Sequence, residues 1–170
     1  MREKSYCYGK SQGYAQRPFK SGGKINLFLK TERRRDDGFH DISTLFLPFS
    51  RPADVLTVDW DAAPGLRVTS SSPEVPGGEK NLVYRAAARY AEAAGLAPSW
   101  TVFIEKNLPV AAGVGGGSAD AGCILSALER RYAALGREKL TQLAATLGSD
   151  VPVFLDGKVC AATGRGEVLR

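Results

Sequence analysis

Hydrophobic and polar residues alternate along the first part of the chain with the period of two that is typical of β-strands. The segments 22–31 (GGKINLFLKT) and 40–49 (HDISTLFLPF) are rich in β-branched and large apolar residues, and the charged run between them contains an Asp-Gly turn signal. We therefore expect an antiparallel hairpin over residues 24–49 with a long charged tip. The same pattern predicts short strands over residues 54–60 and 65–70.

The pattern then changes to apolar residues spaced three and four apart, which predicts amphipathic helices. The first helix is expected over residues 81–95, with Asn81 as its N-cap and Gly95 as the glycine that ends it. Its apolar face carries Leu82, Val83, Ala86, Ala87, Tyr90 and Ala94. A strand is expected next, over residues 99–106.

A second helix is expected from Ser118, which can cap it, to Gly136, which can end it. Its apolar face carries Ala121, Ile124, Leu125, Leu128, Tyr132 and Leu135. A third helix should end at Gly148, followed by strands over residues 151–155 (VPVFL) and 158–163 (KVCAAT). Strands that come first and then alternate with helices indicate an α+β fold. We expect a mixed, largely antiparallel sheet with two or three helices packed on one side.

The most unusual stretch is residues 107–122, NLPVAAGVGGGSADAG, where four of the five positions from Gly113 to Gly117 are glycine. It joins a predicted strand to the N-terminus of a predicted helix. The first amides of a helix lack internal partners and carry partial positive charge, and glycine lets the backbone approach a bulky anion. The order of strand, glycine-rich loop and helix therefore indicates a phosphate-binding site.

Two common phosphate loops do not fit this stretch. The dinucleotide pattern G-x-G-x-x-G, started at Gly113, needs a glycine where Ser118 stands, and the Walker pattern needs a lysine after its last glycine. A flexible strand–helix connection is the alternative, although three glycines directly before a capping serine argue against a mere linker. Asp150, at the expected helix-to-strand junction, can be a turn-capping carboxylate or a general base.

Composition excludes several classes of protein. The 170 residues are 44% hydrophobic and 24% charged, as in one soluble domain, and they contain neither a membrane-spanning apolar run nor a secretory signal. The three cysteines, Cys7, Cys123 and Cys160, are far apart and lack metal-ligand spacing. Their spacing favours a reducing, cytoplasmic setting.

The net charge of +5 is an N-terminal property. Residues 1–35 hold ten Lys and Arg and two acidic residues, a balance of +8, whereas the rest of the chain has a balance of −3. Residues 1–19 have no apolar period, so we expect a basic, disordered tail there and a folded domain over residues 20–170.

Three segments together resemble one family of kinases: GGKINLFLKTERRRDDGFHDISTLF, EKNLPVAAGVGGGSADAG and LGSDVPVFLDG. Over residues 23–169 the chain is similar to the N-terminal half of the 4-diphosphocytidyl-2-C-methyl-D-erythritol kinases. They belong to the GHMP kinase superfamily of galactokinase, homoserine kinase, mevalonate kinase and phosphomevalonate kinase. The resemblance implies that superfamily's N-terminal fold, ATP and Mg²⁺ as cofactors, and phosphorylation of a substrate hydroxyl in the non-mevalonate isoprenoid pathway.

The resemblance also implies roles for single residues. Lys24 and Asp150 match the catalytic pair, so we expect them to meet at ion-pair distance near the glycine-rich loop. Asp150 would accept the proton of the substrate hydroxyl, and Lys24 would keep that carboxylate ionised and stabilise charge on the oxygen. Asn81 and Lys106 match positions near the nucleotide base. The ATP-phosphate loop corresponds to Pro109, Val110, Ala111, Ala112, Gly113, Val114, Gly115, Gly116, Gly117, Ser118 and Ala119.

Three residues match positions around the diphosphocytidyl substrate: Asn26, Phe39 and His40, with the Phe39 ring placed to stack on cytosine. His40 is the only histidine, and without the resemblance it would be a hydrogen-bonding residue beside a turn. We expect no metal held by side chains, because Mg²⁺ would be bound mainly by phosphates and water.

Three features depart from the family pattern. Gly22 and Gly23 stand where the family usually has Pro-Ala, and Ala119 stands where it often has a second serine. The chain also ends at Arg170, where the family continues into a C-terminal domain. We therefore expect impaired catalysis, an exposed apolar patch near residues 151–155 and the C-terminal segment, and self-association through that patch.

The alternative hypothesis is a non-catalytic α+β binding module whose basic tail binds nucleic acid or a protein partner. It leaves Lys24, the glycine-rich loop and Asp150 unexplained together. We therefore expect a small-molecule partner, the diphosphocytidyl substrate, with neither a membrane nor a nucleic acid as partner.

Overall fold

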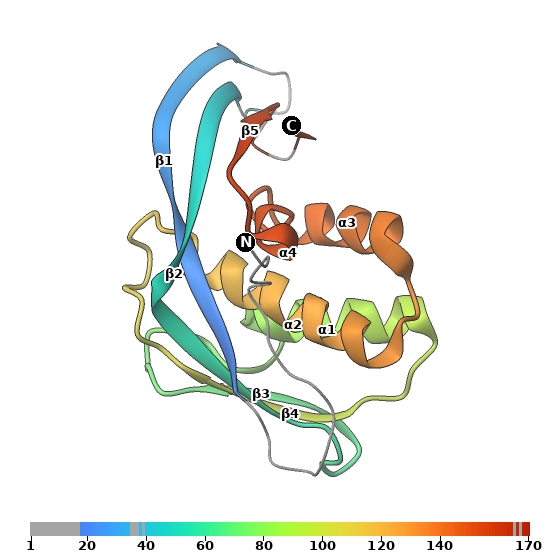
Figure 1. The fold of residues 1–170 in the computed structure, drawn as a ribbon. Helices are drawn as coiled ribbons and strands as arrows, with labels where there is room; N and C mark the ends of the chain where they lie inside the picture. The colour runs from blue at the N-terminus through green and yellow to red at the C-terminus, as the bar shows by residue number, and fades with distance from the viewer. Residues whose placement is uncertain (1–17, 35–37, 39, 165, 167) are drawn as a thin grey trace, which may run out of the picture.

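The computed structural model describes residues 18–34, 38, 40–164, 166 and 168–170, so the predicted tail up to residue 17 and Phe39 lie outside the described residues. Six strands form one sheet that curves around the helices (Figure 1). Strand β1 pairs with β2, and the remaining order is β3-β4-β2-β5-β6. The β3–β4 pair is parallel and the other pairs are antiparallel, which confirms the expected mixed, largely antiparallel sheet.

The predicted hairpin is formed by β1 (Phe19–Arg34) and β2 (His40–Asp59). Residues 54–60, expected as a separate strand, continue β2, because β1 follows the strand past its polar stretch at residues 50–53. A register shift between Ser21 and Gly23 accommodates that stretch. The N-terminal part of β2 pairs with β5 (Cys160–Thr163), and its C-terminal part pairs with β4 (Ser99–Glu105).

The other short strands are β3 (Gly65–Ser70) and β6 (Val168–Leu169). After a 3₁₀ turn over Gly78–Lys80, helix α1 spans Leu82–Ala94 with the predicted caps. The Asn81 side chain accepts a hydrogen bond from the Val83 N–H at 2.8 Å, and Gly95 ends the helix with φ of 65°.

Helix α2 (Gly116–Tyr132) begins two residues before the expected cap. Gly115, in the left-handed region at φ 72°, is the N-cap, so the prediction that Ser118 caps the helix is wrong. The last two glycines of the loop, Gly116 and Gly117, therefore belong to the first helical turn. Gly136 does not end α2 either: the helix ends at Tyr132, and Gly136 is the first residue of α3 (Gly136–Leu147).

The predicted strand over residues 151–155 is wrong, because Val153–Asp156 forms the short helix α4. The N–H of Phe154 and the N–H of Leu155 donate back to the carbonyls of Val151 and Pro152. A short apolar run has no period that separates a buried strand from a buried helical turn. Asp150 therefore lies in a turn between two helices rather than between a helix and a strand.

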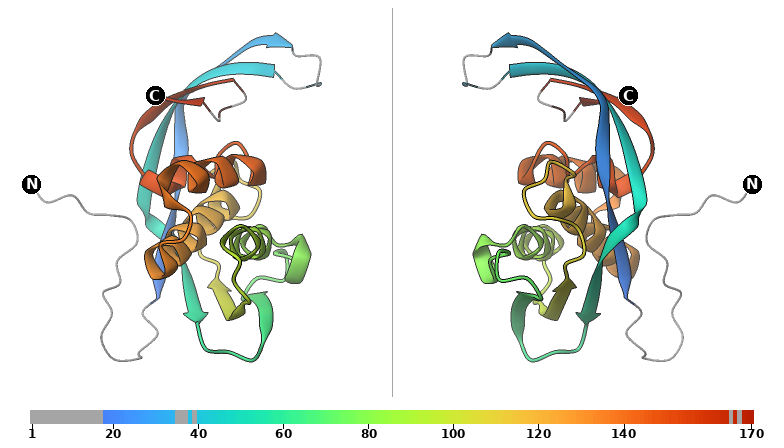
Figure 2. Two further views of the ribbon diagram at one scale, coloured as in Figure 1. Left: turned by 90° about the vertical axis from the view of Figure 1, so that its right-hand side faces the viewer. Right: turned by 90° about the vertical axis from the view of Figure 1, so that its left-hand side faces the viewer.

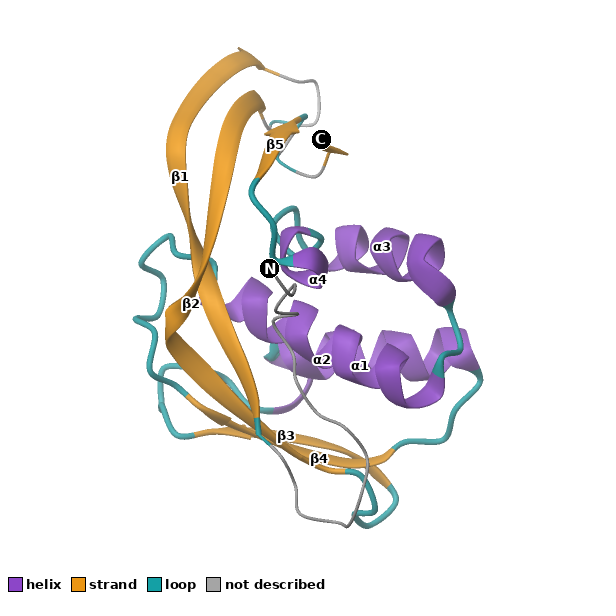
Figure 3. Ribbon diagram, viewed as in Figure 1, coloured by secondary structure: helices purple, strands orange, loops and turns teal. Residues whose placement is uncertain are grey.

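The core lies between the sheet and the helices, which occupy one side of the strands in both views of Figure 2 and in Figure 3. Alternate residues of β2 and β4 pack against the apolar faces of α1 and α2, as the sequence predicts; the buried members include Leu56, Val58, Val102, Ile104, Val83, Ala86, Tyr90, Ile124 and Leu128. Gly122 allows α2 to approach α4, because an added Cβ would lie 2.7 Å from Cβ of Phe154.

The exposed apolar side chains lie only partly where the sequence analysis placed them. Val151 and Val153 are buried because α4 packs against α2, although Val159 and Val168 nearby are exposed. The longest exposed apolar run is on β1, where it comprises Ile25, Leu27, Phe28 and Leu29. Within the described part of the chain, no helix has the length and apolarity needed to cross a membrane.

Candidate functional site

A pocket of about 540 Å³ lies over the N-terminus of α2. The glycine-rich loop lines it from Pro109 to Ser118, and Asn81, Lys106, Lys24 and Asp150 also contribute to its wall. The structure therefore brings together residues from four distant parts of the sequence. Ala119, the last predicted loop residue, is buried in α2 and does not line this pocket.

Positive φ angles and one backbone hydrogen bond to β1 fix the path of the loop. Ala111, Gly113 and Gly115 have positive φ of 58°, 75° and 72°. The N–H of Lys24 donates to the carbonyl of Val114 at 2.8 Å. A Cβ at Gly23 would lie 2.8 Å from that carbonyl oxygen, so a glycine beside Lys24 permits this approach.

The N-terminus of α2 points its free amides into the pocket region. Gly116, Gly117 and Ser118 precede the first helical hydrogen bond, which the N–H of Ala119 donates to the carbonyl of Gly115 at 2.8 Å. Gly117 lines the pocket, and no protein atom lies within 4 Å of a Cβ built there. The space above these amides is open to an anion, which the helix dipole also favours.

Lys24 and Asp150 form the predicted pair, with 3.4 Å between Lys24 Nζ and Asp150 Oδ2. Lys24 is 7% exposed and also donates to Asn26 Oδ1 at 2.7 Å. Asn26 in turn donates to Thr44 Oγ1, and the Thr44 hydroxyl donates to the carbonyl of Phe28. This chain of hydrogen bonds fixes the ammonium at the edge of the pocket, and the expected proximity of Lys24 and Asp150 is confirmed.

The comparisons with known proteins point to the GHMP kinases. Residues 81–158 match the GHMP kinases N terminal domain. The chain is 46% identical over 151 residues to the 4-diphosphocytidyl-2-C-methyl-D-erythritol kinase of Nitratidesulfovibrio vulgaris, an alignment that covers 88% of this chain and 52% of that protein. It is 41% identical over 161 residues to the enzyme of the same name from Persephonella marina, which covers 91% of this chain and 56% of the relative.

A crystal structure of 4-(cytidine 5'-diphospho)-2C-methyl-D-erythritol kinase superposes with a TM-score of 0.77 at 44% identity, covering 91% of this chain and 54% of that chain. The chain contains a GHMP kinase N-terminal domain. It spans about half the length of the curated relatives it matches. Mevalonate kinase of Methanococcus jannaschii, with a TM-score of 0.60 at 10% identity, shares the fold.

This GHMP kinase domain contains a buried charge cluster that the sequence analysis missed. Lys106 Nζ bonds to Asp54 Oδ2 and lies 3.0 Å from Asp120 Oδ2. The side chains of these three residues are at most 6% exposed. The sequence did indicate this burial. Asp54 lies two residues before Leu56 on a strand, and Asp120 lies four residues before Ile124 on a helix, so both carboxylates occupy core-facing positions.

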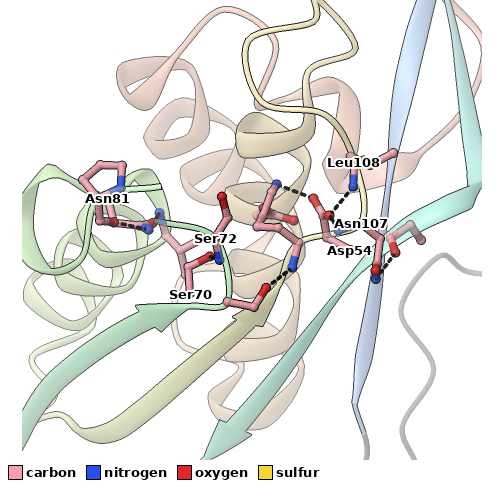
Figure 4. A network of polar contacts seen from close by, with 12 residues as sticks. Asp54, Ser70, Ser72, Asn81, Asn107 and Leu108 are labelled. Atoms are coloured by element: carbon pink, nitrogen blue, oxygen red, sulfur yellow. Dashed lines mark hydrogen bonds and ion pairs between the residues drawn. The ribbon is translucent and has the colours of Figure 1, made fainter. Parts of the chain in front are cut away.

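Burial raises the pKa of Asp120 to about 6, against the opposing effect of the Lys106 ammonium. The two carboxylates raise the pKa of Lys106 above its usual value although burial acts in the opposite direction, so the amine is charged at neutral pH. Asp54 is further held by the N–H groups of Asn107 and Leu108, at 2.6 and 2.8 Å from its Oδ1 (Figure 4).

Asn81 stabilises the wall of the pocket. Besides capping α1, its amide donates to the carbonyl of Pro76 at 2.8 Å, which ties the preceding loop to the helix (Figure 4). That loop supplies pocket residues which the sequence analysis did not name: Glu74, Val75, Pro76 and Lys80.

The residues that the sequence analysis assigned to the acceptor substrate are less concentrated. Asn26 adjoins the pocket through its hydrogen bond with Lys24. His40 is exposed at the start of β2, opposite Arg34 and outside the pocket wall. Among the residues that the structure describes, no group of three or more His, Cys, Asp or Glu side chains could hold a metal ion.

Proposed function

We propose that the chain is the ATP-binding domain of a kinase that phosphorylates the hydroxyl of 4-diphosphocytidyl-2-C-methyl-D-erythritol in isoprenoid biosynthesis. The observation that carries the proposal is the Lys24–Asp150 pair at 3.4 Å, on the wall of a pocket that the glycine-rich loop also lines. The names of relatives 41–46% identical to the chain support this choice of substrate.

The residues present fit ATP as the phosphate donor. The free amides of Gly116, Gly117 and Ser118 would hold its phosphates, and the absence of a Cβ at Gly117 leaves room for them. When bound, ATP supplies the transferred phosphoryl group and Mg²⁺ neutralises part of its charge. The described residues contain no group of three or more His, Cys, Asp or Glu side chains that could hold a metal ion, so Mg²⁺ would be bound mainly through phosphates and water.

Asp150 and Lys24 would activate the acceptor. Asp150 is partly exposed, with its side chain 31% accessible, so its carboxylate can reach a substrate hydroxyl and accept the proton. Lys24 would stabilise negative charge on the attacking oxygen. Its tether to Asn26 holds the ammonium in place, which satisfies the demand of phosphoryl transfer for positioning.

The acceptor would lie along the β1–β2 hairpin, between Asn26 beside the catalytic pair and His40 at the far end of β2. Phe39 would stack on the cytosine. We expect the reaction to take place in the cytoplasm, because the three cysteines are far apart in the sequence and their spacing favours a reducing compartment.

The test has two stages. Calorimetry should first detect Mg²⁺-dependent binding of ATP to the chain, and its absence up to several millimolar would overturn the nucleotide site. A coupled assay of ADP release with the diphosphocytidyl acceptor, and with mevalonate and homoserine as competitors, then tests the substrate. Turnover that is equal with all three acceptors, or greater with a competitor, would contradict the proposed substrate while leaving the nucleotide site intact.

A further inference from the structure

The cluster of Asp54, Lys106 and Asp120 lies directly under the glycine-rich loop. Lys106 immediately follows β4 and bridges the two carboxylates. Asp54 comes from β2, and Asp120 is the fifth residue of α2. The three charged groups thus join β2 to the two elements that flank the loop, β4 and α2.

These contacts reach both ends of the loop. At its start, Asp54 accepts hydrogen bonds from the N–H groups of Asn107 and Leu108 (Figure 4). At its end, a Cβ on Gly116 would lie 3.4 Å from Lys106 Nζ and 3.5 Å from Leu108, so the first turn of α2 rests on the same lysine. Lys106 and its partner Asp54 therefore lie beside both ends of the loop.

The cluster is not electrically balanced when both carboxylates are ionised, because one ammonium serves two of them. Asp120 is 2% exposed, and the Ser21 hydroxyl of β1 lies close enough to its carboxylate to lower its pKa, although neither that hydroxyl nor Asp120 Oδ1 has a partner in full hydrogen-bond geometry among the described residues. A buried carboxylate with an unsatisfied oxygen is costly, and a protein retains one only where another benefit offsets the cost. Lys106 and Asp120 both line the pocket.

We propose that Asp54, Lys106 and Asp120 form a positioning cluster that clamps both ends of the glycine-rich loop, so that the ionised form of Asp120 holds the loop ready for nucleotide. The proposal rests on the proposed function, because it assigns the loop to nucleotide phosphates.

Titration of Asp120 should then change nucleotide affinity. Its pKa is raised to about 6 by burial, so it ionises within the physiological range. The charged groups that face it are Lys106 from the end of β4 and Asp54 from β2, with Lys24 and Asp150 across the same pocket. Below this pKa the protonated carboxyl no longer attracts the ammonium, and Lys106 is held by Asp54 alone.

The decisive experiment measures the dissociation constant of Mg²⁺-ATP between pH 5 and 8 for the wild-type chain and for Asp120→Asn. At pH 7.5 the amide variant should bind about tenfold more weakly, since a charge-assisted hydrogen bond is lost. Near pH 5 the two proteins should bind equally. The titration of ATP is common to both, so the difference between them reports Asp120.

Glu129→Gln is the matched control, because this carboxylate also holds a buried junction of α2 but lies outside the pocket. It should lower stability without altering the pH profile of nucleotide binding. A constant ratio of affinities between wild type and Asp120→Asn across the pH range would overturn the proposal, since a merely structural carboxylate gives that result.

Hydrogen exchange in the ligand-free protein separates this proposal from the proposed function. In Asp54→Asn, the amides of Asn107 and Leu108 should exchange faster, and the amides of Gly116 and Gly117 at the other end of the loop should follow. If wild type binds no ATP, the proposed function fails, and this exchange pattern still decides the clamp. Unchanged exchange at the second end would refute it.

Discussion

The ammonium of Lys24 lies 3.4 Å from the carboxylate of Asp150, although β1 carries the first residue and a turn beyond α3 carries the second. The backbone N–H of the same lysine holds the carbonyl of Val114 in the glycine-rich loop. One residue therefore links the loop to the group proposed to activate the acceptor. No local geometry brings the two side chains together, because the elements from β2 to α3 separate them in the sequence.

Removal of either member of this pair should abolish most of the phosphoryl transfer. We expect Asp150→Asn to lower kcat by about 10²- to 10⁴-fold, the usual contribution of a positioned base. Its KM for ATP should change little, because the carboxylate is proposed to act on the acceptor. Lys24→Met should lower kcat as well. Steady-state ADP release checks both variants.

Lys139→Met is the matched control for the loss of a positive charge, because Lys139 is exposed on α3 and does not line the pocket. It should retain full turnover. An Asp150→Asn variant with a wild-type rate would exclude Asp150 as the base.

Gly117→Ala should separate folding from nucleotide binding. An added Cβ meets no protein atom within 4 Å, and alanine favours a helix by roughly 0.5–1 kcal/mol, so the free energy of unfolding should stay equal or rise. The methyl group would occupy pocket space over the helix amides, and ATP affinity should fall by about tenfold or more. Urea unfolding and calorimetry measure the two effects. A variant that binds ATP normally would show that phosphates do not lie there.

Gly22→Ala, unlike Gly117→Ala, should lower the free energy of unfolding. The added Cβ would lie 1.8 Å from the carbonyl oxygen of Phe49, so the backbone of β2 would have to move. We expect a loss of about 3 kcal/mol or more in the free energy of unfolding, as in severe overpacking. Gly148→Ala is the control, with an extended φ of 171° and its nearest contact at 3.6 Å, and it should be tolerated.

Asn81→Ala should destabilise the protein through the first turn of α1. The variant loses the bond from the Val83 N–H and the bond to the carbonyl of Pro76. Loss of an N-cap costs about 1 kcal/mol, and the freed carbonyl adds to that. Asn81→Ser keeps a capping oxygen and should recover part of the loss in urea unfolding. Equal destabilisation by both substitutions would show that the cap is not the cause.

Glu129 should make stability depend on acid pH. Burial raises the pKa of its carboxyl, but hydrogen bonds from Tyr90 and from the N–H groups of Gly136 and Leu135 outweigh burial and hold the pKa below the ordinary value of 4.5. Because the folded-state pKa is depressed, the stabilisation is present above the unfolded-state pKa and is lost as pH falls through the folded-state value.

The difference in free energy of unfolding between wild type and Glu129→Gln should therefore be full at pH 7 and shrink as pH falls below 4.5. Urea titrations at pH 7, 5 and 3.5 measure it. A difference that does not vary with pH would contradict the role of the ionised carboxylate.

The parts of the fold that could be predicted are those with a clear period or a clear cap. Helix α1 was predicted with its ends because Asn81 and Gly95 flank a regular apolar stripe. The strands of the hairpin alternate plainly, and the position of the pocket followed from the glycine run. The pairing of Lys24 with Asp150 came from the resemblance and not from any periodicity.

The failures have physical causes. Serine favours the N-cap position, which predicts Ser118 as the cap, yet Gly115 reaches the left-handed conformation more cheaply and starts the helix earlier. Apolar residues 151–155 gave no period to separate a strand from a helical turn. Asp54 and Asp120 were overlooked because a carboxylate on a core-facing position is uncommon, and its partner Lys106 is distant in sequence.

Strand β2 also has a consequence for how the protein is made. It pairs with β1, which is synthesised before it. Its other neighbours are β4 and β5, and β5 is synthesised much later. Until Cys160–Thr163 emerges, one edge of β2 near Thr44 stays unpaired, and unpaired strand edges are where nascent chains aggregate. Translation products that stop short of β5 should therefore depend on chaperones and be degraded quickly.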